Sequence, residues 1–81
     1  MQIVVRYFAA AAEAAGSEEE QIELADGATI ADLRSLLEER YGDAMRAVTR
    51  SGSFLIDGTV RRDPEYPLGE RVDILPPFAG G

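Results

Sequence analysis

The sequence predicts an α+β domain in which a mixed β-sheet packs on one main helix. Three observations lead to this prediction. The chain has 81 residues, 46% of them hydrophobic, which suffices for one domain with a single modest core. Residues 30–41 carry apolar positions at helical spacing. The two most apolar β-type segments, residues 2–8 and 71–75, stand near the two ends of the chain.

The charge balance restricts the kinds of partner. The formal net charge is −7, and all eight basic residues are arginine. Nucleic acids and anionic membranes require a basic surface, so neither is expected as a partner, whereas a protein with a basic face is. The chain has no cysteine or histidine, so the usual nucleophiles, general bases and soft metal ligands are missing. We expect no metal site and no independent catalysis.

The location of the protein is predicted from the absence of targeting signals. No hydrophobic run reaches the length of a membrane span, and the first residues lack a signal-peptide pattern. We therefore expect a soluble, cytoplasmic protein. Residues 1–81 are expected to form one domain that ends in a flexible tail, residues 78–81.

The first half of the chain predicts two strands with a short helix between them. Residues 2–8 (QIVVRYF) have apolar side chains on both faces, which indicates a strand inside the sheet. Residues 9–15 (AAAAEAA) are strong helix formers, and Gly16 suits the end of a short helix. Residues 18–24 (EEEQIEL) predict a second strand, antiparallel to the first. Its acidic start is a solvated segment or, alternatively, a patch that steers an arginine-rich partner.

The main helix is predicted over residues 30–41. Thr29 and Asp32 have the spacing of a capping box at its start, and Gly42 is suited to its end. The apolar stripe that we expect to be buried consists of Ile30, Leu33, Leu37 and Tyr41, with Leu36 beside them. The residues expected in solvent are Glu38, Glu39 and Arg40. Residues 43–52 have no period from which an element can be predicted.

The remaining elements complete the sheet. Residues 53–56 (SFLI) predict a short strand, Asp57-Gly58 a tight hairpin turn, and residues 59–61 the returning strand. Residues 71–75 (RVDIL) predict the last strand, with Val72 and Ile74 towards the core. We expect the first and last strands to be parallel neighbours, because the main helix lies in the connection between them. This arrangement is the β-grasp of ubiquitin, with a short extra helix after the first strand.

The end of the chain is unusual because two prolines stop the last strand. Pro76 and Pro77 fix φ and remove backbone donors, so strand pairing cannot continue. Four residues follow, Phe78, Ala79, Gly80 and Gly81. They could reach at most about 13 Å from the fold. Glycine has no side chain, so this end could enter a narrow tunnel in another protein and present a terminal carboxylate. A frayed chain end without a function is the plainer interpretation.

Several segments together carry a family resemblance. They are VVRYFA at residues 4–9, the short helix that Gly16 closes, TIADL at residues 29–33, Asp57-Gly58 before Val60, and PPFAGG at residues 76–81. Over the whole chain they resemble the MoaD/ThiS family of ubiquitin-like sulfur-carrier proteins. The Pro-Pro-x-x-Gly-Gly ending is the specific part. The extra short helix is most similar to the MoaD branch, the small subunit of molybdopterin synthase.

The resemblance implies a chemistry for Gly81. A MoeB/ThiF-like adenylating enzyme would use ATP to join the Gly81 carboxylate to AMP, and persulfide sulfur would then displace AMP and leave a thiocarboxylate. In the MoaD branch the loaded tail enters a MoaE-like large subunit. It donates sulfur to cyclic pyranopterin phosphate in molybdopterin (molybdenum cofactor) biosynthesis. The carrier itself binds no cofactor in this scheme and is not catalytic alone.

The resemblance also implies a partner-facing surface beside the root of the tail. By matching positions, this surface includes Phe8, Val60 and Leu75, and Arg61 and Arg62 are candidates for contacts at its rim. Ordinary packing in the core or on the sheet is the alternative for each of them. Phe8 is the strongest candidate, because other residues of its strand already supply the core face.

Three alternatives remain open at the level of the sequence. The sulfur acceptor could belong to cysteine biosynthesis, thiazole formation, tRNA thiolation or a secondary-metabolite pathway. The chain could instead be a ubiquitin-like modifier that forms isopeptide bonds with lysines of other proteins. It could also be a β-grasp interaction module whose Gly-Gly ending has no chemical role.

Overall fold

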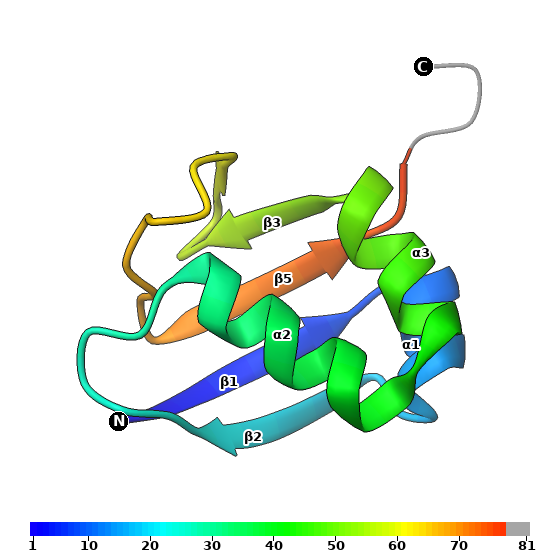
Figure 1. The fold of residues 1–81 in the computed structure, drawn as a ribbon, viewed down its shortest axis with the longest axis horizontal. Helices are drawn as coiled ribbons and strands as arrows, with labels where there is room; N and C mark the ends of the chain where they lie inside the picture. Colours follow the sequence, from blue (N-terminus) through cyan, green and yellow to red (C-terminus); the bar gives the residue numbers. More distant parts are fainter. Residues whose placement is uncertain (78–81) are drawn as a thin grey trace.

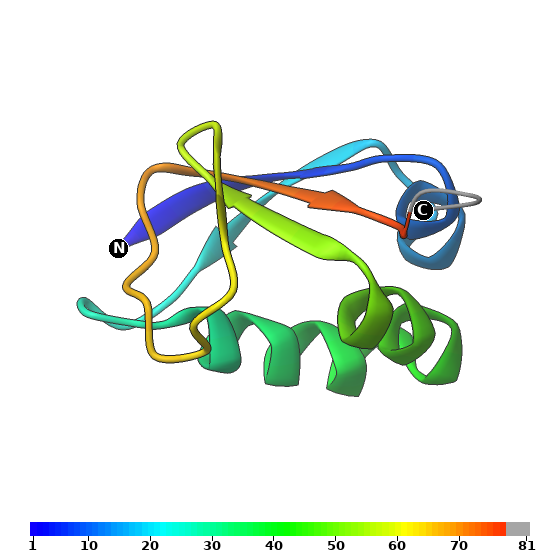
Figure 2. The same ribbon diagram turned by 90° about the horizontal axis from the view of Figure 1, so that it is seen from above.

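A five-stranded sheet forms one layer of the fold, and two helices pack on one of its faces (Figures 1 and 2). The structure, a computed structural model, describes residues 1–77. The elements in chain order are β1 (Gln2–Tyr7), α1 (Ala10–Ala15), β2 (Glu19–Glu23), α2 (Ile30–Tyr41), α3 (Asp43–Ser51), β3 (Ser53–Ile56), β4 (Thr59–Arg61) and β5 (Arg71–Leu75). In Figure 2, α2 and α3 lie below the sheet and α1 lies at one end.

The strands are arranged in the order β2-β1-β5-β3-β4. β1 and β5 are adjacent and parallel, with Val5 opposite Val72 and Tyr7 opposite Ile74. The other three pairings are antiparallel. The predicted mixed sheet, with the first and last strands as parallel neighbours inside it, is therefore confirmed.

The core lies between the sheet and α2. Alternate residues of β1 and β5 face inward, and they are at most 2% exposed: Ile3, Val5, Tyr7, Val72 and Ile74. α2 contributes Ile30, Leu33 and Leu37 from the predicted stripe, while Tyr41 is half-buried. Burial of each large apolar side chain contributes about 1.5–3 kcal/mol, so this interface holds the two layers together.

The predicted ends of the helices and the predicted hairpin are confirmed. Thr29 Oγ1 accepts a hydrogen bond from the Asp32 amide, and Asp32 Oδ2 accepts one from the Thr29 amide, which is a capping box. Gly16 ends α1 in the left-handed conformation. Asp57 and Gly58 both have positive φ, 48° and 88°, as a type I′ turn requires.

One helix was not predicted. Residues 43–52, for which no element was predicted, contain α3, and its buried residues, Met45, Val48 and Thr49, stand at helical spacing. The sheet is therefore covered by two helices rather than by one main helix alone. α3 extends the covered face towards the end of β5, where the tail begins (Figure 1).

Contacts with Glu38 hold α3 against α2. The prediction that Glu38 lies in solvent was wrong. Its side chain is only 11% exposed. Glu38 Oε2 accepts a hydrogen bond from Thr49 Oγ1 at 2.8 Å, and Oε1 lies 3.6 Å from both Arg46 Nε and Arg50 Nη2. Three partners from α3 thus converge on one carboxylate of α2. This charge is satisfied only because the unpredicted helix brings its partners together.

A second carboxylate, Glu20, connects β2 to the rest of the fold. It accepts hydrogen bonds from the hydroxyl groups of Tyr7 and Tyr41 and, at 3.0 Å, from Arg40 Nη1. Burial alone would raise the pKa of Glu20, but the bonds from Tyr41, Tyr7 and Arg40 outweigh it and lower this pKa below its ordinary value. Burial and the bond to Glu20 raise the pKa of Tyr7, so its hydroxyl remains a donor at neutral pH.

The lowered pKa of Glu20 predicts a loss of stability in acid. In the unfolded chain Glu20 has an ordinary pKa of about 4.3, and in the folded state its pKa is lower. The folded protein therefore keeps this carboxylate ionised at pH values where the unfolded chain already binds the proton. This stabilisation is present above about pH 4.3 and is lost as the pH falls through the folded-state value. We expect Glu20→Gln to lower the free energy of unfolding by about 1–3 kcal/mol at pH 7.

The measurement is urea unfolding at several pH values between 7 and 3. The difference in the free energy of unfolding between wild type and Glu20→Gln should shrink as the pH falls. The control is Glu39→Gln, at an exposed position of α2, which should change the free energy of unfolding little at every pH. A difference for Glu20→Gln that is the same at pH 3 as at pH 7 contradicts the role assigned to this carboxylate.

Candidate functional site

The surface of the sheet opposite α2 and α3, called the open face below, is the candidate site. Among residues 1–77, no helix covers this face of the sheet (Figure 2). Side chains alternate along each strand, so residues that flank the buried positions of β1 and β5 point to the open face. A sheet face without a covering layer is available for contact with another protein.

Phe8 and Leu75 lie side by side at one end of the open face. The Phe8 amide donates a hydrogen bond to the Ile74 carbonyl at 3.1 Å, which continues the β1–β5 register by one residue and brings Phe8 next to Leu75. Both residues are half-buried. The Arg6 guanidinium lies 5.3 Å from the centroid of the Phe8 ring, which places Phe8 on the same face as Arg6.

Val60 lies on the same face, at the outer edge of the sheet. Leu55 is paired with Val60 on one side and with Asp73 on the other, and directly paired residues share a face. Val60 is 45% exposed, the highest value for a large hydrophobic residue within residues 1–77. The structure thus brings Phe8, Leu75 and Val60 together on one surface.

Arg61 and Arg62 are exposed but are not grouped with these three residues. Arg61 is paired with Phe54, whose side chain is buried on the helix side of the sheet. Strand alternation therefore separates Arg61 from Val60, and the Arg61 guanidinium lies 4.6 Å from the centroid of the Tyr66 ring. Arg62 lines a cavity on the helix side.

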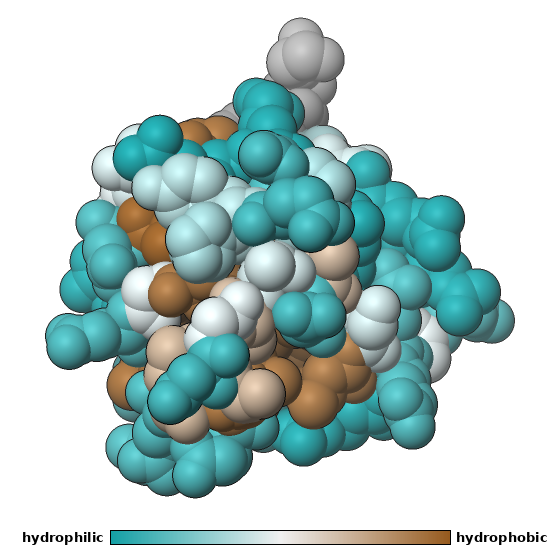
Figure 3. Space-filling view, turned by 60° about the vertical axis from the view of Figure 1, so that its left-hand side comes forward, coloured by the Kyte–Doolittle hydropathy of each residue, from teal (hydrophilic) through white to brown (hydrophobic). Residues whose placement is uncertain are grey.

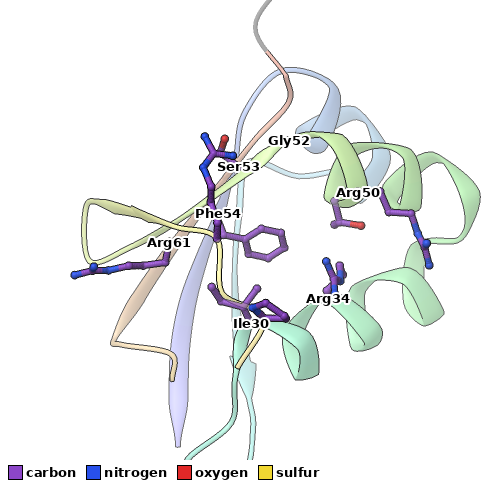
Figure 4. Close-up of a pocket in the computed structure, with 10 residues that line it drawn as sticks. Ile30, Arg34, Arg50, Gly52, Ser53, Phe54 and Arg61 are labelled. Atoms are coloured by element: carbon purple, nitrogen blue, oxygen red, sulfur yellow. The ribbon is translucent and has the colours of Figure 1, made fainter. Parts of the chain in front are cut away.

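A small cavity of about 180 Å³ lies on that helix side, between α2, the end of α3 and the start of β3 (Figure 4). Four arginines line it, but they do not converge. Arg61 points away from Phe54 in Figure 4, and Arg50 is paired with Glu38. No cluster of three potential metal-ligating side chains occurs in the described part of the chain either. The helix side therefore offers no built ligand site.

Three charged residues on the open face were not singled out in the sequence. Arg6, Asp73 and Arg71, called the charged cluster below, lie at its centre. Asp73 Oδ1 is 3.8 Å from Arg6 Nε and 3.9 Å from Arg71 Nε. Asp73 is 8% exposed although no helix covers it. The predicted parallel pairing of residues 2–8 with 71–75 was the available signal, since it brings Arg6 next to Asp73.

The root of the tail is held by a close backbone contact. A β-carbon on Gly52 would lie 2.0 Å from the Leu75 carbonyl oxygen and 2.7 Å from the Val48 carbonyl oxygen. Only glycine allows the end of α3 to approach the end of β5 this closely. Gly52 therefore fixes where the chain leaves the sheet, just before Pro76 and Pro77.

The four residues after this root, Phe78, Ala79, Gly80 and Gly81, lie outside the described residues. Their assignment as the reactive tail, and that of Gly81 as the carrier of the adenylate and thiocarboxylate, stay predictions.

Comparison with known proteins identifies the family of the chain. Residues 5–81 match the ThiS family. The chain belongs to the ThiS family. It is a sulfur carrier of the MoaD/ThiS type. A relative from Chlamydomonas reinhardtii, the molybdopterin synthase sulfur carrier subunit, is 37% identical over 84 residues, which cover 100% of both chains.

Solved structures share the fold of this carrier. A putative molybdopterin converting factor, subunit 1, from Pyrococcus furiosus has a TM-score of 0.82 and 25% identity, and the match covers 96% of this chain and 99% of the other. A complex of subunits 1 and 2 of molybdopterin-converting factor from Helicobacter pylori 26695 contains a chain with a TM-score of 0.70 and 20% identity, with 100% of both chains covered. The expected β-grasp is thereby confirmed.

The face of the carrier seen in Figure 3 is largely polar. Hydrophilic residues cover most of the face in Figure 3, with smaller hydrophobic areas between them. None of the helices in residues 1–77 has the length and hydrophobicity needed to cross a membrane. The open face, with Val60 at its edge, remains the candidate for contact with a partner.

The contact at Gly52 predicts a sensitive position. Gly52→Ala would push its β-carbon against two backbone oxygens, so the chain must shift at the root of the tail. We expect a loss of about 1–3 kcal/mol in the free energy of unfolding, with Tm lower by at least about 4 °C. Ser51→Ala, at the exposed preceding position, is the control and should change the stability by no more than about 0.5 kcal/mol. Equal thermal unfolding curves for the two variants would refute the close contact.

Proposed function

We propose that this carrier holds sulfur as a thiocarboxylate of Gly81 and, as the small subunit of molybdopterin synthase, donates it to cyclic pyranopterin phosphate. The observation that carries the proposal is the match to the Chlamydomonas sulfur carrier subunit over the whole of both chains. The end of β5 supports it, because Pro76 and Pro77 stop strand pairing directly before the tail.

The first step activates a carboxylate, which is a poor acyl donor. An adenylating enzyme transfers AMP from ATP to the Gly81 carboxylate, forming a mixed anhydride and releasing pyrophosphate. The terminal sulfur of a protein persulfide then attacks the carbonyl carbon, and AMP leaves with the electron pair of the broken bond. A second thiolate attacks the resulting acyl disulfide at the sulfur that is not bonded to the Gly81 carbonyl carbon. The S–S bond breaks, which yields the thiocarboxylate of Gly81 and a new disulfide. Two glycines before the carboxyl group give these enzymes close access.

The second step transfers the sulfur in a complex with a larger subunit. The thiocarboxylate acts as a sulfur nucleophile towards the pterin precursor, and hydrolysis of the acyl group returns the Gly81 carboxylate. The carrier contributes its tail to this reaction, and the partner contributes the catalytic groups, since the carrier has no histidine, cysteine or lysine. A carrier of this kind is a co-substrate in the cytoplasm rather than an enzyme on its own.

Docking on the open face gives the folded domain its role. Phe8 and Leu75 adjoin the root of the tail, and Val60 extends the apolar surface towards β4. The tail must enter a tunnel in the partner. An apolar contact area beside the root of the tail would align the tail with the partner's active site. The complex of subunits 1 and 2 of molybdopterin-converting factor supports a large subunit as this partner.

The proposal is tested by intact mass after incubation with ATP, a MoeB-like adenylating enzyme and a persulfide donor. We expect a mass increase equal to the exchange of one oxygen for one sulfur, which is located at Gly81 by fragmentation. A variant with one alanine added after Gly81 should show no exchange, because the reactive carboxylate is then displaced from the glycine pair. The loaded protein should produce molybdopterin when a MoaE-like subunit and the pterin precursor are added.

Three results would contradict the proposal. An extended variant that loads as fast as wild type would show that Gly81 is not the reactive end. A loaded carrier that is inactive with the large subunit, but active with another sulfur acceptor, would move the protein to a different pathway. Covalent conjugates with protein lysines on a denaturing gel would indicate a modifier instead.

A further inference from the structure

The direction in which the chain leaves the sheet depends on where α3 ends. Gly52, labelled directly after α3 in Figure 4, lies against the Leu75 carbonyl oxygen at the end of β5. Because a β-carbon on Gly52 would be 2.0 Å from that oxygen, the hydrogen that glycine has instead points at it. Pro76 and Pro77 follow Leu75 with a fixed φ, so the orientation of the Leu75 peptide group sets their direction.

The connection between α2 and α3 does not determine where α3 lies. Gly42 is the single residue between the two helices, and its φ is 75°. Glycine adopts many backbone conformations, so this link permits several directions for α3. Met45 and Val48 are buried and hold α3 on the core, but apolar contact is not directional. The orientation of α3 therefore depends on contacts that have a defined geometry.

The contact with a defined geometry joins α3 to Glu38 of α2. Thr49 Oγ1 donates a hydrogen bond to Glu38 Oε2 at 2.8 Å, and the Thr49 side chain is buried. Arg46 Nε and Arg50 Nη2 lie 3.6 Å from Glu38 Oε1, which is longer than a hydrogen bond. The two arginines add attraction to the carboxylate, whereas Thr49 fixes the position of the helix against it.

One turn of α3 connects this hydrogen bond to the root of the tail. Thr49 stands three residues before Gly52, and the Gly52 amide donates a hydrogen bond to the Val48 carbonyl at 2.7 Å. A β-carbon on Gly52 would meet the Val48 oxygen as well as the Leu75 oxygen. Contacts this close leave no free space that could absorb a movement. A displacement of Thr49 is thus transmitted to the Leu75 peptide group.

We infer that Thr49 and Glu38 are positioning residues for sulfur transfer: they orient α3, and α3 orients the Leu75 peptide group from which the tail extends. The inference rests on the proposed function. Leu75 is also paired with Ser53 of β3, and if strand pairing were sufficient, α3 would not influence the reaction.

The effect is expected in the transfer step rather than in docking. A reacting group that is misplaced by about 1 Å can lose about 10²-fold in rate. The open face lies on the opposite side of the sheet from α3, so a small movement of α3 leaves the docking residues in place (Figure 2).

The test is single-turnover sulfur transfer from the loaded carrier to the pterin precursor at several concentrations of the MoaE-like large subunit. Thr49→Val keeps the shape of the side chain and removes the hydroxyl group. Its rate constant at saturation should be at least about fivefold lower than that of wild type, with the half-saturating concentration within about twofold. Circular dichroism at the assay temperature selects conditions in which every variant is folded.

Two matched variants accompany Thr49→Val. Thr49→Ser keeps the hydroxyl group and should restore the rate constant to within about twofold of wild type. Ser51→Ala changes an exposed hydroxyl group of the same helix, which bonds to the Ala47 carbonyl and not to Glu38, and it should also remain within about twofold.

A second measurement needs neither loading nor a partner. In amide NMR spectra of the free carrier, Thr49→Val should shift the Leu75 signal, whereas Ser51→Ala, although closer to Gly52 in the sequence, should leave it unchanged. Glu38→Gln keeps an acceptor for Thr49 but loses the attraction of the arginines, and should give a smaller shift.

A Thr49→Val rate constant within about twofold of wild type would overturn the inference, and so would a loss seen only in the half-saturating concentration. An unmoved Leu75 signal in Thr49→Val would also overturn it. Failure of the proposed function looks different, because wild type itself would then load no sulfur at Gly81 or transfer none.

Discussion

The parallel pairing of β1 with β5 is the constraint on which the remaining features depend. It joins the two ends of the chain in the middle of the sheet, with Val5 opposite Val72 and Tyr7 opposite Ile74. A slip of one residue would turn every side chain of β5 to the other face, and the buried Val72 and Ile74 would be exposed. The same register places Phe8 beside Leu75 and Arg6 beside Asp73. The core and the open face are thus determined by one strand pairing.

The helices stabilise this arrangement from the other side through two nearly buried carboxylates. Glu38 on α2 binds partners from α3, and Glu20 on β2 binds partners from β1 and α2. In a chain of 81 residues the apolar core is small, so polar contacts between elements matter for stability. Gly52 extends this support to the root of the tail. The covered face therefore fixes the geometry of the open face and of the chain's exit from the sheet.

Much of the fold was predictable because local signals agreed with the tertiary structure. The capping box at Thr29, the glycine at the end of α1 and the Asp57-Gly58 turn all depend on residues close in the sequence, and all were found as predicted. α3 was missed although its buried residues, Met45, Val48 and Thr49, stand at helical spacing, because only two of them are hydrophobic and the helix is short. The burial of Glu38 was missed because its partners come from α3, and a local pattern does not contain contacts between elements.

The candidate site was predictable in part. Phe8, Val60 and Leu75 came from a family resemblance and fall on one face, whereas strand alternation separates Arg61 from Val60. The charged cluster was missed because Arg6 and Asp73 are 67 positions apart and meet only through the parallel register. An aspartate between two inward-facing residues in β5 looks like an ordinary exposed position until its neighbour on β1 is known.

The central claim is that the β1–β5 pairing forms the surface on which the large subunit docks. Cross-saturation NMR of the isotope-labelled carrier, bound to the unlabelled large subunit, tests it directly. Saturation of the large subunit should reduce the methyl signals of Leu55, Val60 and Leu75, and leave that of Leu36 on α2 unchanged. Loss of the Leu36 signal with unchanged signals from the other three residues would place the partner on the helix side and contradict the account.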